Sequence, residues 1–194
     1  MIEAVRPAVT GDLDRLGELL AAFDDGVRLR RGGDKRRVED GGRPPGAPDD
    51  VGEYLFRADR TALVGTLDGW VAGMALCRRS GDPGSARGAL DACYVEPGAR
   101  EVGLGHLLLE ACLAWFAEQG CTGVDGVVHP GDRGAKQFFE RAGFNYHSKV
   151  TIWKCPVIER GRTNSYGLLH NQLTRDSAAS RQGMPDYLVV MRKW

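Results

Sequence analysis

Between residues 86 and 129 the chain reads as a strand, a glycine-containing turn, a long helix and a second strand. The helix is expected over residues 103–119, and Gly120 ends it. Its predicted buried face carries Leu104, Leu107, Leu108, Ala111, Cys112 and Trp115. A strand, a crossover helix and another strand predict two parallel strands covered by the helix. This succession constrains the fold more than any other part of the sequence.

Antiparallel pairing is expected in the first half of the chain. Residues 61–67 and 70–79 read as strands, and Asp68-Gly69 between them is a strong two-residue hairpin signal. Residues 2–6 read as an earlier strand, and a helix with its apolar face ending near Phe23 follows it. Asp50 and Glu53 have the spacing of a capping box for a short helix over residues 51–58.

The second half adds a helix capped by Asp132 and ended by Gly143, then a β-rich stretch over residues 144–155. Residues 186–192 read as a last strand. We expect an α+β fold, a single domain with a mixed, mostly antiparallel sheet flanked by helices. The domain is expected over residues 1–155, with an insertion or extension over 156–185 and its last strand in 186–194.

Composition favours one globular domain without a strongly charged partner. The chain has 194 residues, and its 26 basic side chains balance 26 acidic ones, which argues against a nucleic-acid or membrane-surface protein. Apolar runs fall short of the ~18 residues of a membrane span, and the first residues do not resemble a signal peptide. Five cysteines without a C-x-x-C motif predict reduced thiols, no metal site and a cytoplasmic location.

Residues 24–50 are rich in glycine and proline, which predicts a mobile loop rather than a regular element. Seven basic and seven acidic side chains cancel over this range. We therefore expect its charges to be a solvated surface rather than an anion site.

The turn around residues 94–107 is the part of the sequence that points to chemistry. Backbone N–H groups at the start of a helix have no intrahelical acceptor, and the helix dipole adds positive charge there. Gly103 and Gly105 would allow a phosphate to approach the backbone, and Arg100 and His106 would add charge. The spacing fits neither a dinucleotide fingerprint nor a P-loop. Glycines that serve only helix packing are the alternative.

Two motifs give this chain a resemblance to a known family. Arg100-x-x-Gly103-x-Gly105 follows a strand that ends in Val95-Glu96-Pro97, and a second block runs from Asp132 through Phe139-Glu140 to Gly143-Phe144. Together they resemble the acyl-CoA motifs of the GNAT family of N-acetyltransferases, over about three quarters of the chain. The resemblance implies a sheet whose central strands, ending at Val95 and His129, splay apart around the pantetheine arm of acetyl-CoA.

The resemblance also implies which residues bind acetyl-CoA. The backbone N–H groups of the turn would hold the pyrophosphate, the end of the preceding strand would line the arm, and the second block would lie near the arm and the phosphates. Phe139 stands where the family often has a tyrosine that protonates the leaving thiolate. The implied binding residues are Cys93, Tyr94, Val95, Arg100, Val102, Gly103, Leu104, Gly105, His106, Asp132, Arg133, Lys136 and Phe139.

Three residues are candidates for proton transfer. Asp91 lies four residues before Val95 and would accept a proton through water or position the amine; a solvent-facing aspartate is the alternative. His129 ends the next strand and has a suitable ordinary pKa, with turn capping as the alternative. Tyr146 would replace the missing acid, or serve only packing.

The function that the resemblance implies is transfer of an acetyl group from acetyl-CoA to a primary amine of a small molecule or peptide, by direct attack in a ternary complex. The alternative is a catalytically degenerate acyl-CoA-binding module, because Phe139 has no proton to give. The expected partners are acetyl-CoA and an unidentified amine, without nucleic acid, membrane or metal. A homodimer is one alternative for the oligomeric state.

Overall fold

The structure is a computed structural model, and it describes residues 2–29, 51–82, 84–128, 132–151 and 187–193. For residues 146–151 and 187–193 it describes the backbone. His129, the insertion over 156–185 and most of the expected loop lie outside these residues.

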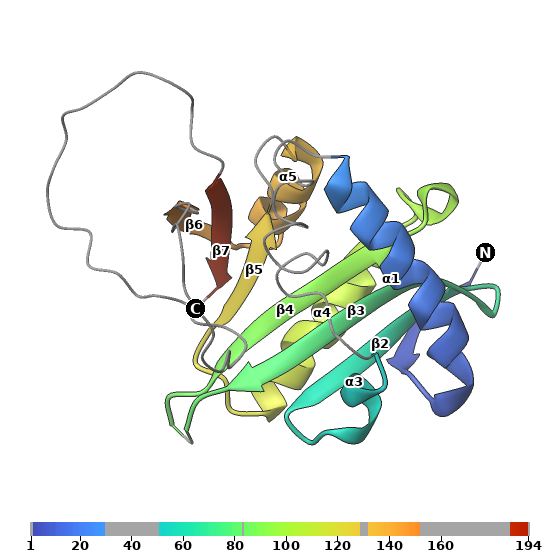
Figure 1. The fold of residues 1–194 in the computed structure, drawn as a ribbon, viewed down its shortest axis with the longest axis horizontal. Coiled ribbons are helices and arrows are strands. Elements are labelled where there is room, and N and C mark those ends of the chain that lie inside the picture. Colours follow the sequence, from blue (N-terminus) through green and yellow to red (C-terminus); the bar gives the residue numbers. More distant parts are fainter. Residues whose placement is uncertain (1, 30–50, 83, 129–131, 152–186, 194) are drawn as a thin grey trace, which may run out of the picture.

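The described strands form one mixed sheet in the order β1-β2-β3-β4-β5-β7-β6 (Figure 1). All neighbouring strands are antiparallel except β4 and β5, which are parallel. The strands are β1 (Glu3–Pro7), β2 (Arg60–Leu67), β3 (Trp70–Ser80), β4 (Arg87–Val95), β5 (Val124–Val128), β6 (Asn145–Thr151) and β7 (Tyr187–Lys193). This confirms the predicted α+β class with a mixed, mostly antiparallel sheet.

Helices pack on both faces of the sheet. On one face lie α1 (Leu13–Arg28), which follows a 3-10 turn at Thr10–Asp12, and the short α3 (Glu53–Phe56). On the other face lie α4 (Leu104–Glu118) and α5 (Arg133–Arg141). The 3-10 helix η2 (Pro97–Ala99) connects β4 to the residues before α4.

The hairpin between β2 and β3 forms at the predicted turn. Asp68 and Gly69 have φ values of 48° and 84°, the left-handed pair that a tight two-residue hairpin requires. The last two strands pair antiparallel, and β7 lies between β5 and β6.

Three local expectations need correction. The first helix runs to Arg28 instead of ending near Asp24, because Val27 is buried at 7 % exposure and adds a further turn to the apolar face. The helix expected over residues 51–58 is reduced to α3, since Arg57 has an extended backbone. The buried face of α4 includes Leu109 and Phe116, whereas Leu107 is 38 % exposed. Apolar residues surround most of this helix, so the periodicity alone did not fix its orientation.

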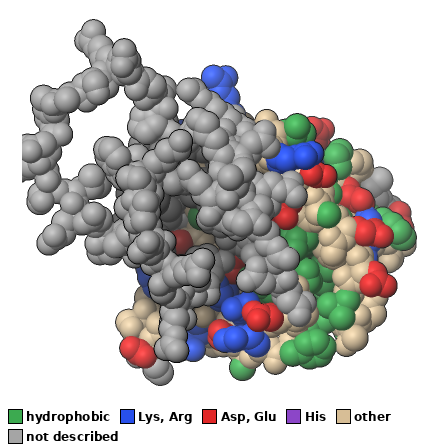
Figure 2. Space-filling view, in the orientation of Figure 1, with side chains coloured by type: hydrophobic (Ala, Val, Ile, Leu, Met, Phe, Trp, Pro, Cys, Tyr) green, Lys and Arg blue, Asp and Glu red, His purple; other side chains and the backbone are tan. Residues whose placement is uncertain are grey.

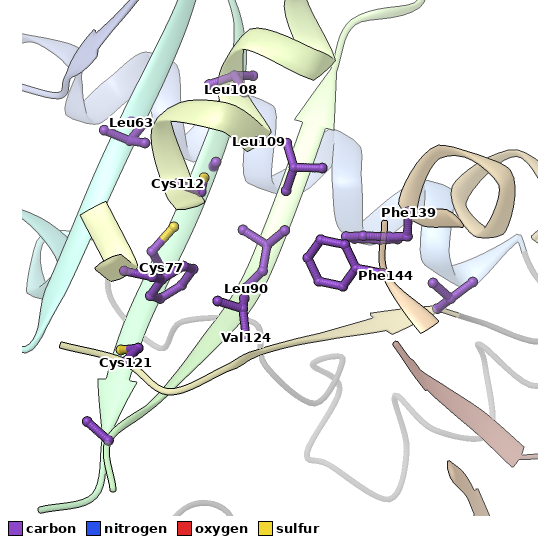
Figure 3. Packing of buried hydrophobic residues seen from close by; sticks show 14 residues of the cluster. Leu63, Cys77, Leu90, Leu108, Leu109, Cys112, Cys121, Val124, Phe139 and Phe144 are labelled. Carbon is purple, nitrogen blue, oxygen red and sulfur yellow. The ribbon is translucent and has the colours of Figure 1, made fainter. Parts of the chain in front are cut away.

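The core has two main layers, one on each face of the sheet. The α4 and α5 side is filled by residues such as Leu90, Leu108, Phe139 and Phe144 (Figure 3), and the α1 and α3 side by residues such as Leu16 and Met74. Among the described residues, Cys77, Cys93, Cys112 and Cys121 are free cysteines; Cys155 lies outside them.

A break in strand pairing separates β4 from β5. The two strands pair over Gly88–Leu90 and Val124–Gly126, and the described pairing stops there although β4 continues to Val95. On the other side of β4, Leu76 pairs with Ala92 and Cys77 with Leu90, so Asp91 is an extra residue in a β-bulge. The bulge shifts the alternation: Leu90 packs toward α4 and Ala92 toward α1. The predicted splay is therefore present, and it begins at Asp91.

Candidate functional site

The turn that leads from β4 into α4 has the backbone of an anion cradle. Glu101 and Gly103 are left-handed, with φ values of 70° and 95°, and Val102 between them is not. The N–H groups of His106 and Leu107 both donate to the carbonyl oxygen of Gly103, at 2.9 and 3.1 Å. Within the described residues, the N–H groups of residues 102–105 have no acceptor. Successive free N–H groups in such a turn form a concave site that favours an anion.

Gly105 lies where three elements meet. A Cβ added to it would lie 3.4 Å from the ring of Phe138 on α5 and 3.8 Å from the side chain of Val95 at the end of β4. The ring of His106 is 5.3 Å from that of Phe138. The first turn of α4 carries no acidic side chain, while Leu104 is fully buried and fixes the helix start against the sheet. The first turn of α4 therefore adds no negative charge to that of Glu101, which precedes it.

Arg100 is held against the end of β4. Its Nε donates to the carbonyl oxygen of Val95 at 2.9 Å, and its guanidinium lies 5.7 Å from the centre of the Tyr94 ring. The side chain remains exposed beside the turn. Its charge therefore contributes to the same surface as the free N–H groups.

The predicted lining residues at the end of β4 point to opposite faces. Cys93 and Val95 pack toward α4 and Tyr94 toward α1. Burial raises the pKa of the Cys93 thiol far above its ordinary value, so this side chain remains a neutral thiol. Cys93 is thus a packing residue rather than a nucleophile.

Asp91 is buried, so the solvent-facing alternative for this residue is wrong. Its side chain is 4 % exposed and accepts hydrogen bonds from the Tyr54 hydroxyl at 2.6 Å and from Arg78 Nε and Nη2 at 3.1 and 3.3 Å. Burial raises the pKa of the Asp91 carboxyl, and Arg78 and Tyr54 oppose this shift. The carboxylate is engaged with protein donors on the α1 and α3 side of the sheet.

The second motif block forms the start and the buried face of α5. Asp132 caps the helix by accepting a hydrogen bond from the N–H of Ala135 at 3.0 Å. Arg133 is exposed, and Lys136 forms a weak surface ion pair with Glu140 at 3.5 Å. The Phe139 ring is 6 % exposed, lies 5.0 Å from that of Phe144 and packs over Gly126 of β5.

The structure does not describe the side chains of two of the predicted proton-transfer residues. His129 lies outside the described residues. Tyr146 is on β6, where its backbone pairs with Met191, and its side chain is not described. Both roles stay predictions.

Tyr54 and Arg78 were missed as partners of Asp91 by the sequence analysis. Tyr54 has the spacing of a helical core residue, and Arg78 follows the apolar run of β3. Each pattern by itself indicates a structural residue and not a partner of Asp91. Arg78 directly after that run was the one usable signal, because a charge at the end of a buried strand requires a partner.

Basic, acidic and apolar side chains are interspersed over the described part of the face in Figure 2. Among the described residues, no helix is long and apolar enough to cross a membrane. Nor do these residues contain a group of three or more potential metal ligands.

The chain thus combines an opened mixed sheet with a left-handed glycine turn at the start of the helix that follows the opening. The sequence model of the GNAT acetyltransferase family matches residues 34–144, more than half of the chain. The chain belongs to this family. No curated protein sequence matches the chain.

Solved structures of the same fold cover nearly the whole chain at low sequence identity. A GNAT acetyltransferase from Streptococcus pneumoniae is 16% identical with a TM-score of 0.58, covering 99% of each chain. Arabidopsis thaliana Naa50, in complex with the bisubstrate analogue CoA-Ac-MVNAL, is 14% identical with a TM-score of 0.59, covering 100% of this chain and 99% of its own. A GNAT acetyltransferase from Elizabethkingia anophelis with acetyl-CoA bound is 10% identical with a TM-score of 0.59, covering 98% and 96%.

Proposed function

We propose that this protein is an acetyl-CoA-dependent N-acetyltransferase that acts on a primary amine of a small molecule or peptide. The observation that carries the proposal is the turn before α4, where four successive N–H groups, those of residues 102–105, lack an acceptor among the described residues. In a member of the GNAT family, an anion cradle at this position suits the pyrophosphate of CoA. The structure of the Elizabethkingia anophelis acetyltransferase with acetyl-CoA bound supports acetyl-CoA as the ligand.

The residues of the turn fit such a ligand. The free N–H groups of Val102, Gly103, Leu104 and Gly105 are assigned to the pyrophosphate, with Arg100 beside them. The N–H of His106, also expected to bind it, donates instead to the carbonyl oxygen of Gly103. A Cβ at position 103 would be strained, because only glycine adopts a φ of 95° without cost. Arg133 and Lys136 are exposed and are assigned to the more distant phosphates.

The opened edge of β4 is assigned to the pantetheine arm. Beyond Leu90, β4 has no described pairing with β5, so that edge is available to a ligand up to Val95, whose carbonyl oxygen already accepts a hydrogen bond from Arg100. The pantetheine arm carries amides, and amides can continue the hydrogen-bonding pattern of an unpaired strand edge.

In the reaction, the neutral amine forms a C–N bond to the acetyl carbon and the C–S bond breaks. The amine loses a proton and the thiolate takes one up. A thiol of ordinary pKa ~8.5 is a fairly good leaving group, so a weak acid or water suffices. We assign proton acceptance to His129, whose ordinary pKa of ~6.5 suits a base near neutral pH, and the donor role to Tyr146 or water.

One observation favours a second candidate, a domain that binds acyl-CoA without turnover. Phe139 occupies the motif position where the family often has a tyrosine, and its ring packs against Phe144 and Gly126. Thiol release from acetyl-CoA across a panel of amines, together with calorimetry of CoA binding, separates the two. Release with at least one amine supports the enzyme, whereas binding without release on any amine supports the module.

The cytoplasmic location and the homodimer stay predictions. Sedimentation at several protein concentrations tests the second.

A further inference from the structure

A side-chain hydrogen bond between Tyr54 and Asp91 links α3 to β4. The phenol oxygen is 2.6 Å from the carboxylate oxygen, a length typical of a strong hydrogen bond to an ionised acceptor. Tyr54 is 3 % exposed, so water does not compete for this bond. A charge buried to this extent depends on its protein partners.

Arg78 of β3 completes the link on the same face of the sheet. Its guanidinium donates to both carboxylate oxygens of Asp91 and is itself 15 % exposed. Arg60, its cross-strand neighbour on β2, lies over the Tyr54 ring at 5.2 Å and pairs with Glu53. Each of these two cross-strand arginines therefore has its own carboxylate partner, which offsets the repulsion expected between like charges on neighbouring strands.

The linked carboxylate belongs to the residue at which β4 changes course. Asp91 is the extra residue of the bulge, and the described pairing of β4 with β5 ends at Leu90 and Gly126. A bulge bends its strand and locally interrupts the ladder of backbone hydrogen bonds. Here the side chain of the bulged residue is held from α3 and from β3 at once.

We propose that Tyr54 and Arg78 are positioning residues, which hold the Asp91 bulge and thereby set the separation of β4 from β5 that receives the pantetheine arm. This inference rests on the proposed function, since it is that function which assigns the arm to the opening. The two residues act through Asp91 and are not assigned a contact with the substrate. The same argument makes Asp91 a positioning residue rather than the proton acceptor.

A ligand pair isolates this effect. Acetyl-CoA carries both the phosphates and the arm, whereas 3′-phospho-ADP carries the phosphates alone. Tyr54→Phe removes one hydroxyl and keeps the ring under Arg60. We expect it to weaken acetyl-CoA binding about tenfold, the scale of a hydrogen bond to a charged group, and to change 3′-phospho-ADP binding less than twofold. Backbone amides of residues 91–95 should exchange faster in the free variant.

Two further variants control the experiment. Arg78→Lys keeps the charge but loses the bidentate contact with Asp91. We expect it to weaken acetyl-CoA binding about threefold and to leave 3′-phospho-ADP binding unchanged. Thr66→Val deletes another buried hydroxyl, which lies on β2 and donates to the carbonyl oxygen of Ala4 at 3.4 Å. It should change neither ligand's affinity nor exchange at residues 91–95.

Equal weakening of both ligands by Tyr54→Phe, or no change in either, would overturn the positioning role while leaving the proposed function intact. A wild-type protein that binds neither ligand would overturn the proposed function, and this inference with it. Selective loss of acetyl-CoA binding with faster exchange at the bulge would support both.

Discussion

The Nε of Arg100 lies 2.9 Å from the carbonyl oxygen of Val95, to which it donates a hydrogen bond. The residue that leads the turn is thereby tied to the last residue of β4. The contact couples the end of the opened strand to the anion cradle at α4. It also orients a positive charge beside N–H groups that already favour an anion.

Replacement of Arg100 should separate the contribution of its contact with Val95 from that of its positive charge. Arg100→Lys keeps a positive charge but replaces the planar guanidinium with an ammonium group. We expect a loss of about threefold in CoA affinity. Arg100→Ala removes charge and contact, and we expect a loss of about tenfold that shrinks at high salt because exposed charges are screened. Calorimetry of CoA at two ionic strengths measures both. Equal affinity for all three proteins would contradict the role of Arg100.

Glu101 places both strain and a negative charge at the turn. Its φ of 70° is left-handed, which costs a non-glycine residue about 1 kcal/mol. Glu101→Gly removes the strain and the charge, so we expect a higher Tm and tighter CoA binding. Glu101→Ala removes the charge alone and should improve binding without raising Tm. Thermal melts and CoA titrations of the two variants test this, and weaker binding by both would contradict it.

Asp12 should make stability depend on pH. Hydrogen bonds from Arg6 lower the pKa of the Asp12 carboxyl, against the effect of burial. Because the folded pKa lies below the unfolded one, this stabilisation is present above about pH 4 and is lost as the pH falls through the folded value. We expect Asp12→Asn to cost about 1–2 kcal/mol at pH 7 and a smaller amount at about pH 3.

The matched control for that measurement is Asp14→Asn, on the exposed side of α1. It should change the free energy of unfolding by less than about 0.5 kcal/mol at either pH. Urea titrations at both pH values give the comparison. A pH-independent cost of Asp12→Asn would show that the ion pair with Arg6 is not its source.

His129 and Asp91 should respond differently in the pH profile of kcat. With His129 as the base, kcat of the wild type falls below about pH 6.5, and His129→Ala lowers kcat by about 10². Asp91→Asn, as a change in a positioning residue, should raise KM for acetyl-CoA and keep the shape of the profile. A profile whose acidic limb disappears in Asp91→Asn but persists in His129→Ala would reverse the two roles.

Features set by neighbouring residues were predictable from the sequence. The hairpin at Asp68-Gly69 and the turn around Gly103 depend on local backbone conformation, and both form where the residues indicate. The family motif predicts the same turn because it contains the glycines that this backbone conformation requires. These segments locate the candidate site.

Features set by distant partners were not predictable. Asp91 meets Tyr54 and Arg78 across 37 and 13 residues of sequence, and one extra residue in β4 moves its side chain to the α3 side. Periodicity cannot reveal such a shift, because it assumes an unbroken alternation. For a related reason, the buried face of α4 could not be predicted from periodicity: apolar residues surround most of the helix, and packing against the sheet decides which of them are buried.

The central claim, that the turn before α4 holds the pyrophosphate of CoA, is tested most directly by calorimetry of acetyl-CoA with two variants of Gly105. In Gly105→Ala the added Cβ would make an ordinary 3.4 Å contact with Phe138, so we expect a folded protein that still binds. In Gly105→Glu a carboxylate would stand beside the phosphates, and we expect binding to fall by at least 10² while the circular dichroism and Tm stay close to those of Gly105→Ala. Unchanged acetyl-CoA affinity in a folded Gly105→Glu protein would contradict the account.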